Sequence, residues 1–156
     1  MAFLTKEFIR TKFEPRTADI PVPDLKQWFD GDDLVWRVRG LDGNELGRCN
    51  ALAEKNRRSI TEIAEGLTSG KSAELIGTVR QLVGLGDDIP MEVAQGIEYL
   101  ICGSVNPECD LDLAVKLNLN FPVEFRQLVH RIIHLTGMGF AAAGKPPASG
   151  TDPISK

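Results

Sequence analysis

The two histidines of the segment "HRIIH" form the pattern in this sequence that comes nearest to a metal site. His130 and His134 are four residues apart, so a helix places both on one face, as in a two-histidine zinc pair. The zinc proteases with this spacing need a glutamate directly after the first histidine, and Arg131 stands there. Both histidines also lie away from the apolar stripe of their predicted helix, which consists of Phe125, Leu128, Val129, Ile132 and Ile133. We therefore expect a solvated polar face without a metal, and we keep a small metal-dependent enzyme using these histidines as an alternative.

The remaining residues with reactive side chains form no recognisable catalytic set. Cys102 and Cys109 have a spacing that fits no known group of zinc ligands, so we expect them to be small buried apolar groups. The segment "SGKS" at 69–72 resembles the end of a phosphate-binding loop, but Glu65 stands where the first glycine is needed. Acidic residues cluster in predicted loops and first helical turns, where solvation and the helix dipole favour them: Asp30, Asp32, Asp33, Asp87, Asp88, Glu108, Asp110 and Asp112. We predict no catalytic residues and no cofactor, and hence not an enzyme.

The composition is that of a soluble globular protein with one domain. The chain has 156 residues, of which 42% are hydrophobic and 26% charged. Its net charge of -4 argues against nucleic acid or a membrane surface as a partner. No run of about 18 apolar residues is present, and the N-terminal segment lacks the pattern of a signal peptide. The three widely spaced cysteines are typical of reduced thiols, which favours a cytoplasmic protein.

One segment before the helices alternates with a period of two. Leu34, Trp36 and Val38 fall on one face of residues 34–39, which predicts a half-buried strand. The two prolines of "DIPVP" suit an edge strand at 19–23, which could pair with this strand. The pattern therefore predicts a small antiparallel β-ribbon within residues 19–39, packed on helices because a ribbon alone is marginally stable.

Arg37 and Arg39 lie on the outer face of that ribbon. A basic surface for nucleic acid interleaves exposed aromatic side chains with its arginines, whereas Trp36 lies on the opposite face here. We therefore expect the two arginines to form ion pairs with Asp or Glu.

From Gly40 onward the pattern is helical as far as Gly137. Asp42 is a predicted N-cap, with Glu45 three residues later. Further helix starts are predicted at the capping box Ser59–Glu62, near Ser72, at Pro90, at Asn106–Pro107 and near Pro122. The sequence thus predicts a mainly α, compact helical domain of five or six helices over residues 18–139. Residues 1–17 are expected to form an N-terminal arm, and residues 140–156 a flexible Gly/Pro-rich tail.

Taken in order, several segments resemble the tail assembly chaperones of long-tailed, siphovirus-type bacteriophages and prophages. They are "DIPVPDLKQW", "LVWRVRGL", "DGNEL", "NPECDLDLAVKL" and "PVEFRQLVHRIIHLTGMG", within residues 18–140. The resemblance implies a mostly helical domain with a small β element. It also implies binding of the tape measure protein and recruitment of tail tube protein during tail assembly, in the cytoplasm of the bacterial host. Such a chaperone is absent from the mature virion, and many have a longer, frameshifted form. A tail completion or adaptor protein of the phage is the nearest alternative.

A candidate client-binding segment lies in "DLDLAVKLNLNF". Its apolar residues alternate, which on a helix spreads them around the circumference, so that one packed face cannot bury them all. They are Leu111, Leu113, Val115, Leu117, Leu119 and Phe121. Some of these side chains should remain exposed, where they could bind a client or a second copy of the chain in a homo-oligomer.

Overall fold

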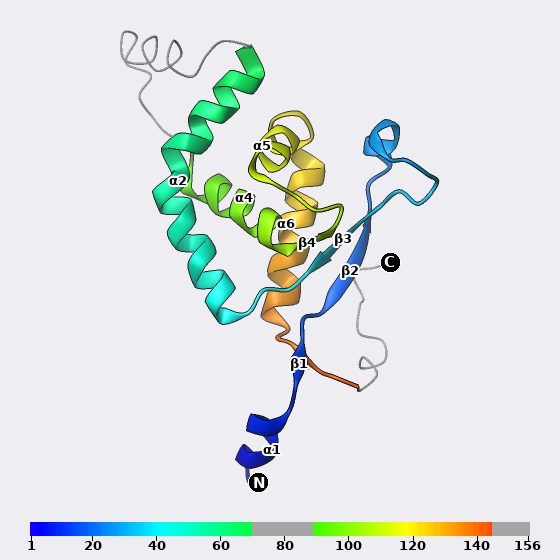
Figure 1. Cartoon of the computed structure of the whole chain (residues 1–156), viewed down its shortest axis with the longest axis vertical. Coiled ribbons are helices and arrows are strands. Elements are labelled where there is room, and N and C mark those ends of the chain that lie inside the picture. Colours follow the sequence, from blue (N-terminus) through cyan, green and yellow to red (C-terminus); the bar gives the residue numbers. More distant parts are fainter. Residues whose placement is uncertain (70–88, 145–156) are drawn as a thin grey trace.

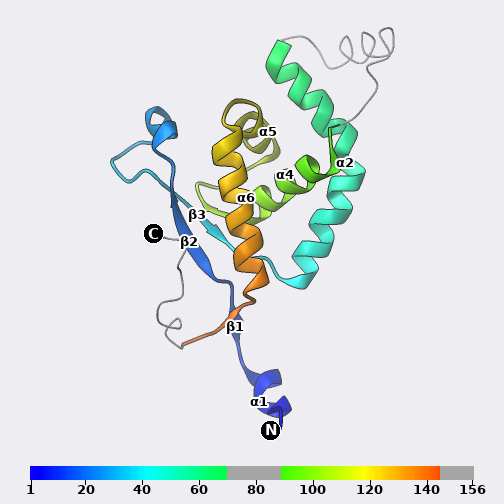
Figure 2. The same cartoon turned by 180° about the vertical axis from the view of Figure 1, so that it is seen from behind.

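The computed structural model describes residues 1–69 and 89–144, and the mainly α fold with a small β part is confirmed there. Four helices make up most of the body: α2 (Gly43–Ser69), α4 (Met91–Gly103), α5 (Leu111–Asn120) and α6 (Pro122–Gly137). In Figure 1, α4 lies between α2 and α6, and the sheet lies on the side of α6 away from α2. Figure 2 shows the same order of layers from behind.

The predicted ribbon is present and gains a third strand. β2 (Thr17–Pro21) and β3 (Val35–Arg39) pair antiparallel, with Asp19 opposite Arg37 and Ile20 opposite Trp36. β4 (Ser104–Asn106) pairs antiparallel with the other edge of β3, so the strand order is β2-β3-β4. The prolines of the first segment suit this arrangement, because Pro21 ends an edge strand and Pro23 begins the 3-10 helix η1 (Pro23–Trp28).

The helix start predicted at Asn106–Pro107 is wrong. Asn106 is the last residue of β4, and its pairing with Arg37 holds it in the sheet. The helix begins at Leu111 instead, where the Asp110 side chain accepts a hydrogen bond from the Leu113 amide at 2.9 Å. Asp110 thus satisfies a free amide of the first turn, as an N-cap does.

The cap predicted at the start of α2 is confirmed, whereas the second cap inside it is wrong. The Glu45 amide donates to Asp42 Oδ1 at 2.7 Å, and the Asp42 amide donates to Glu45 Oε1 at 3.1 Å. Ser59–Glu62 lies inside the same continuous helix. There Thr61 Oγ1 donates to the Arg57 carbonyl and accepts from the Ile89 amide, so this segment fastens the chain at residue 89 to α2. The helix predicted from about residue 72 lies outside the described residues.

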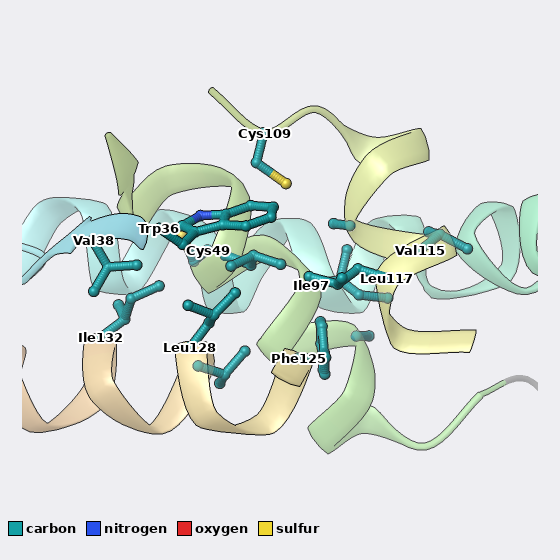
Figure 3. Packing of buried hydrophobic residues seen from close by; sticks show 14 of the residues in the cluster. Trp36, Val38, Cys49, Ile97, Cys109, Val115, Leu117, Phe125, Leu128 and Ile132 are labelled. Atoms are coloured by element: carbon teal, nitrogen blue, oxygen red, sulfur yellow. The ribbon is translucent and has the colours of Figure 1, made fainter. Parts of the chain in front are cut away.

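The core lies between the sheet and the four helices (Figure 3). Trp36 and Val38 enter it from β3, as the alternation predicted, with exposed fractions of 3% and 0%. The other labelled side chains come from α2, α4, α5, α6 and the loop before α5: Cys49, Ile97, Val115, Leu117, Phe125, Leu128, Ile132 and Cys109. The predicted stripe of α6 is therefore buried except at Ile133, which is 48% exposed.

The N-terminal arm holds a helix and a strand and projects from one end of the body. α1 (Thr5–Arg10) is followed by β1 (Phe13–Glu14), which pairs antiparallel with β5 (Ala141–Ala142). Both views show α1 at the end of the long axis, beyond the sheet (Figures 1 and 2). The flexible tail predicted from residue 140 is thus wrong for Ala141–Ala142, because the arm supplies these residues with a pairing strand. Residues 145–156 lie outside the described part.

Candidate binding surface

The six candidate client-binding residues of α5 and the following turn divide into two groups. Val115 and Leu117 are buried in the core, and Leu111 and Phe121 are half-buried against it. Leu113 and Leu119 are each 38% exposed. The structure therefore exposes one residue near each end of the predicted segment, Leu113 and Leu119, while its middle packs inward.

A surface tryptophan meets this segment where α5 turns into α6. The rings of Trp28 and Phe121 lie edge to face, with centroids 5.5 Å apart. Trp28 is 63% exposed, and Val123, in the first turn of α6, is 61% exposed. We call Trp28, Leu119, Phe121 and Val123 the corner surface. It joins η1 to the α5–α6 turn at the end of the molecule opposite the arm (Figure 1).

Trp28 and Val123 were not among the predicted site residues, although the sequence carries a signal for Val123. Val123 lies on α6 away from the stripe that begins at Phe125, so a helical wheel places it outside the core. Trp28 had no such signal, because its place opposite Phe121 depends on the tertiary fold.

Acidic side chains outnumber basic ones in the segments that supply the corner surface and in the loop after η1. The exposed acids Asp24, Asp30, Asp32 and Asp33 belong to η1 and the loop after it, and Glu124 follows Val123. The exposed bases are Lys26 in η1, Lys116 in α5 and Arg126 near the start of α6, and α5 adds the exposed acid Asp112. A partner for this surface should therefore combine apolar and basic side chains.

The two arginines of β3 form the ion pairs predicted for them, but only one of the pairs is exposed. Arg37 Nε lies 2.7 Å from Asp19 Oδ1, and this contact holds the pKa of Asp19 below its usual value. Arg39 is half-buried and forms a two-pronged pair with Glu45, through which it lowers the pKa of Glu45 to about 2. The Cys102 thiol also donates to Glu45 at 3.2 Å. These contacts connect β3, α2 and α4, and they hold the three elements together.

The two histidines are exposed, and two of the three cysteines are buried. His130 and His134 are both exposed on α6, as predicted for a polar face. Among residues 1–69 and 89–144, no three His, Cys, Asp or Glu side chains are grouped closely enough to hold a metal. Burial raises the pKa of Cys49 and of Cys109 to about 12, so these thiols stay protonated and are poor nucleophiles.

The candidate phosphate loop at 69–72 extends beyond the described residues, as do Asp87 and Asp88. Where the structure describes the chain, no helix has the length and apolar character needed to cross a membrane.

Comparison with known proteins found no matching family model, no matching curated protein and no matching solved structure. By its fold and its exposed residues, the chain is a small, mainly helical domain with an exposed aromatic surface. The resemblance to tail assembly chaperones stays a prediction from the sequence.

Proposed function

We propose that this chain is a tail assembly chaperone of a long-tailed bacteriophage, which binds the tape measure protein and helps to recruit tail tube subunits. The observation that carries the proposal is the corner surface, where Trp28 and Val123 are 63% and 61% exposed. Exposed apolar side chains that adjoin one another mark interaction sites more often than chance.

The chemistry of the corner surface suits an apolar helix face as its ligand. A tape measure protein is a very long, helix-rich chain whose apolar faces are uncovered before the tube forms around it. Trp28 and Phe121 offer rigid aromatic area, which contributes strongly to binding because few rotamers are lost. The surrounding acids favour a helix whose flanking residues are Lys or Arg.

The corner surface also rests on a rigid base, which suits a binding role. Phe121 packs against the core, and its carbonyl accepts a hydrogen bond from the Phe125 amide at 2.9 Å. Leu25 of η1 is buried and fixes the short helix that presents Trp28. A ligand therefore meets side chains that are already in place, which lowers the entropy lost on binding.

Co-expression with the tape measure protein of the same phage tests the proposal. The native chain should increase the soluble fraction of that protein severalfold, and the double variant Trp28→Glu/Val123→Glu should lose this effect. Ile133→Glu is the matched control, since Ile133 is an exposed apolar residue on α6 outside the corner surface. A tape measure protein that is equally soluble with and without the chain would contradict the proposal.

A further inference from the structure

The N-terminal arm presents a row of exposed aromatic side chains. α1 has no buried residue, and Phe3, Phe8 and Ile9 are 72%, 53% and 74% exposed. The Phe8 ring lies 5.3 Å from that of Phe3 and 5.2 Å from that of Phe13, so the three rings are neighbours. An ordered aromatic row in water is unfavourable, and its burial against another surface would be stabilising.

Residues 139–143, which follow α6, hold the arm in position. Its strand β1 pairs with β5, and the Ala143 amide donates to the Lys12 carbonyl at 2.8 Å. Arg16 Nε donates to the Gly139 carbonyl at 3.1 Å. These bonds fix where the arm leaves the body, so its aromatic row is presented rather than folded back.

The charge of the arm is opposite to that of the rest of the chain. Residues 1–16 contain four basic residues and two acidic ones, whereas the whole chain has a net charge of -4. The corner surface is also apolar, but acids predominate in the segments that supply it and in the loop after η1. The two surfaces are therefore complementary both in apolar character and in charge.

We propose that the arm of one copy docks on the corner surface of a second copy. The arm and the corner surface lie at opposite ends of the molecule (Figures 1 and 2), so the contact forms between copies and not within one. Different patches of the two partners meet in this contact, which makes it a head-to-tail interface. The proposal does not depend on any client.

Sedimentation velocity of the full chain over a concentration series tests this docking. Phe8→Glu changes the arm, Val123→Glu changes the corner surface, and Ile133→Glu adds the same charge elsewhere on α6. The first two variants should each raise the apparent dissociation constant at least tenfold, while the control should leave it unchanged. Added salt should also weaken association, because the charges are exposed. Each of the three residues is exposed, so thermal unfolding should confirm that all variants fold.

Mixing the two weakened variants distinguishes docking on the corner surface from other contacts of the arm. Phe8→Glu keeps an intact corner surface and Val123→Glu keeps an intact arm, so an equimolar mixture should form 1:1 dimers. A contact between two arms cannot be restored in this way. A native chain that stays monomeric, or a mixture that does so, would overturn the proposal. Arm-dependent binding to phosphatidylserine vesicles without self-association would also overturn it, in favour of a membrane as the partner.

Discussion

The indole Nε1 of Trp36 donates a hydrogen bond to Ser104 Oγ at 3.0 Å, and this hydroxyl in turn donates to the Leu100 carbonyl at 2.6 Å. Trp36 is the largest core side chain of β3, and Ser104 begins the strand that pairs with β3. The bond gives the buried indole a partner for its polar atom, as buried tryptophans require. It also ties the end of α4 to the sheet.

Replacement of Trp36 should be among the most destabilising changes in the protein. Trp36→Ala removes a nearly fully buried side chain, and we expect a loss of about 3–5 kcal/mol in the free energy of unfolding. Ser104→Ala leaves the indole N–H unpaired and should cost about 1–3 kcal/mol. Urea denaturation measures both. If Trp36→Ala lowered the free energy of unfolding by less than Ser104→Ala, the assignment of Trp36 to the core face of β3 would be contradicted.

The two arginines of β3 should differ in their contribution to stability. Arg37→Gln breaks an exposed ion pair and should leave the free energy of unfolding nearly unchanged. Arg39→Gln leaves Glu45 half-buried without its partner and should cost about 1.5–3 kcal/mol. The sequence predicted that both arginines are exposed, whereas the structure buries part of Arg39. Chemical denaturation of the two variants distinguishes these two assignments. Equal losses in the free energy of unfolding would favour the prediction from the sequence, in which both arginines are exposed.

Stability should depend on pH through Glu45. Its pKa falls from the ordinary 4.5 to about 2 in the folded protein, so the unfolded chain takes up the proton first. The stabilisation is therefore present above pH 4.5 and is lost as the pH falls toward 2. Between pH 6 and pH 3 the native chain should lose about 2 kcal/mol more than Glu45→Gln, which has no carboxylate to titrate. Equal losses in the two proteins would argue against the pair with Arg39.

A glycine at the end of β3 should be intolerant of any side chain. A Cβ atom at Gly40 would lie 2.9 Å from the Leu135 carbonyl carbon, which is backbone and cannot rotate away. We expect Gly40→Ala to cost about 1–3 kcal/mol, as overpacking does. Gly43→Ala is the matched control, because a Cβ there meets nothing within 4 Å. Calorimetry of the two variants measures the difference, and similar melting temperatures would contradict the close approach of β3 to α6.

The parts of the fold that the sequence predicted are those that local patterns encode. The alternation around Trp36 and the stripe from Phe125 to Ile132 each place apolar residues on one side of one element. β4 was missed because "SVN" has no such pattern, and only its pairing with β3, 69 residues earlier by the Arg37–Asn106 register, makes it a strand. Ser59–Glu62 has the residues of a capping box, but it lies inside the continuous helix α2, where Thr61 accepts a hydrogen bond from the distant Ile89 amide.

The candidate site was only partly visible in the sequence for a similar reason. Alternation in α5 correctly indicated that some apolar residues stay exposed, and Leu113 and Leu119 are those residues. It could not show which side the neighbouring helices cover, so Val115 and Leu117 proved to be core. Trp28 joins the surface from a segment 93 residues away, through its contact with Phe121.

Quenching of Trp28 fluorescence by acrylamide tests the proposed client surface most directly. Of the two tryptophans, Trp36 is buried, so an external quencher reaches Trp28. The Phe8→Glu variant should be used, so that the arm of a second copy does not compete. A purified helical segment of the tape measure protein should bind and reduce the quenching of Trp28 severalfold, and Val123→Glu should abolish this protection. A segment that fails to bind, or that binds while Trp28 stays equally accessible, would contradict the assignment of this surface to the client.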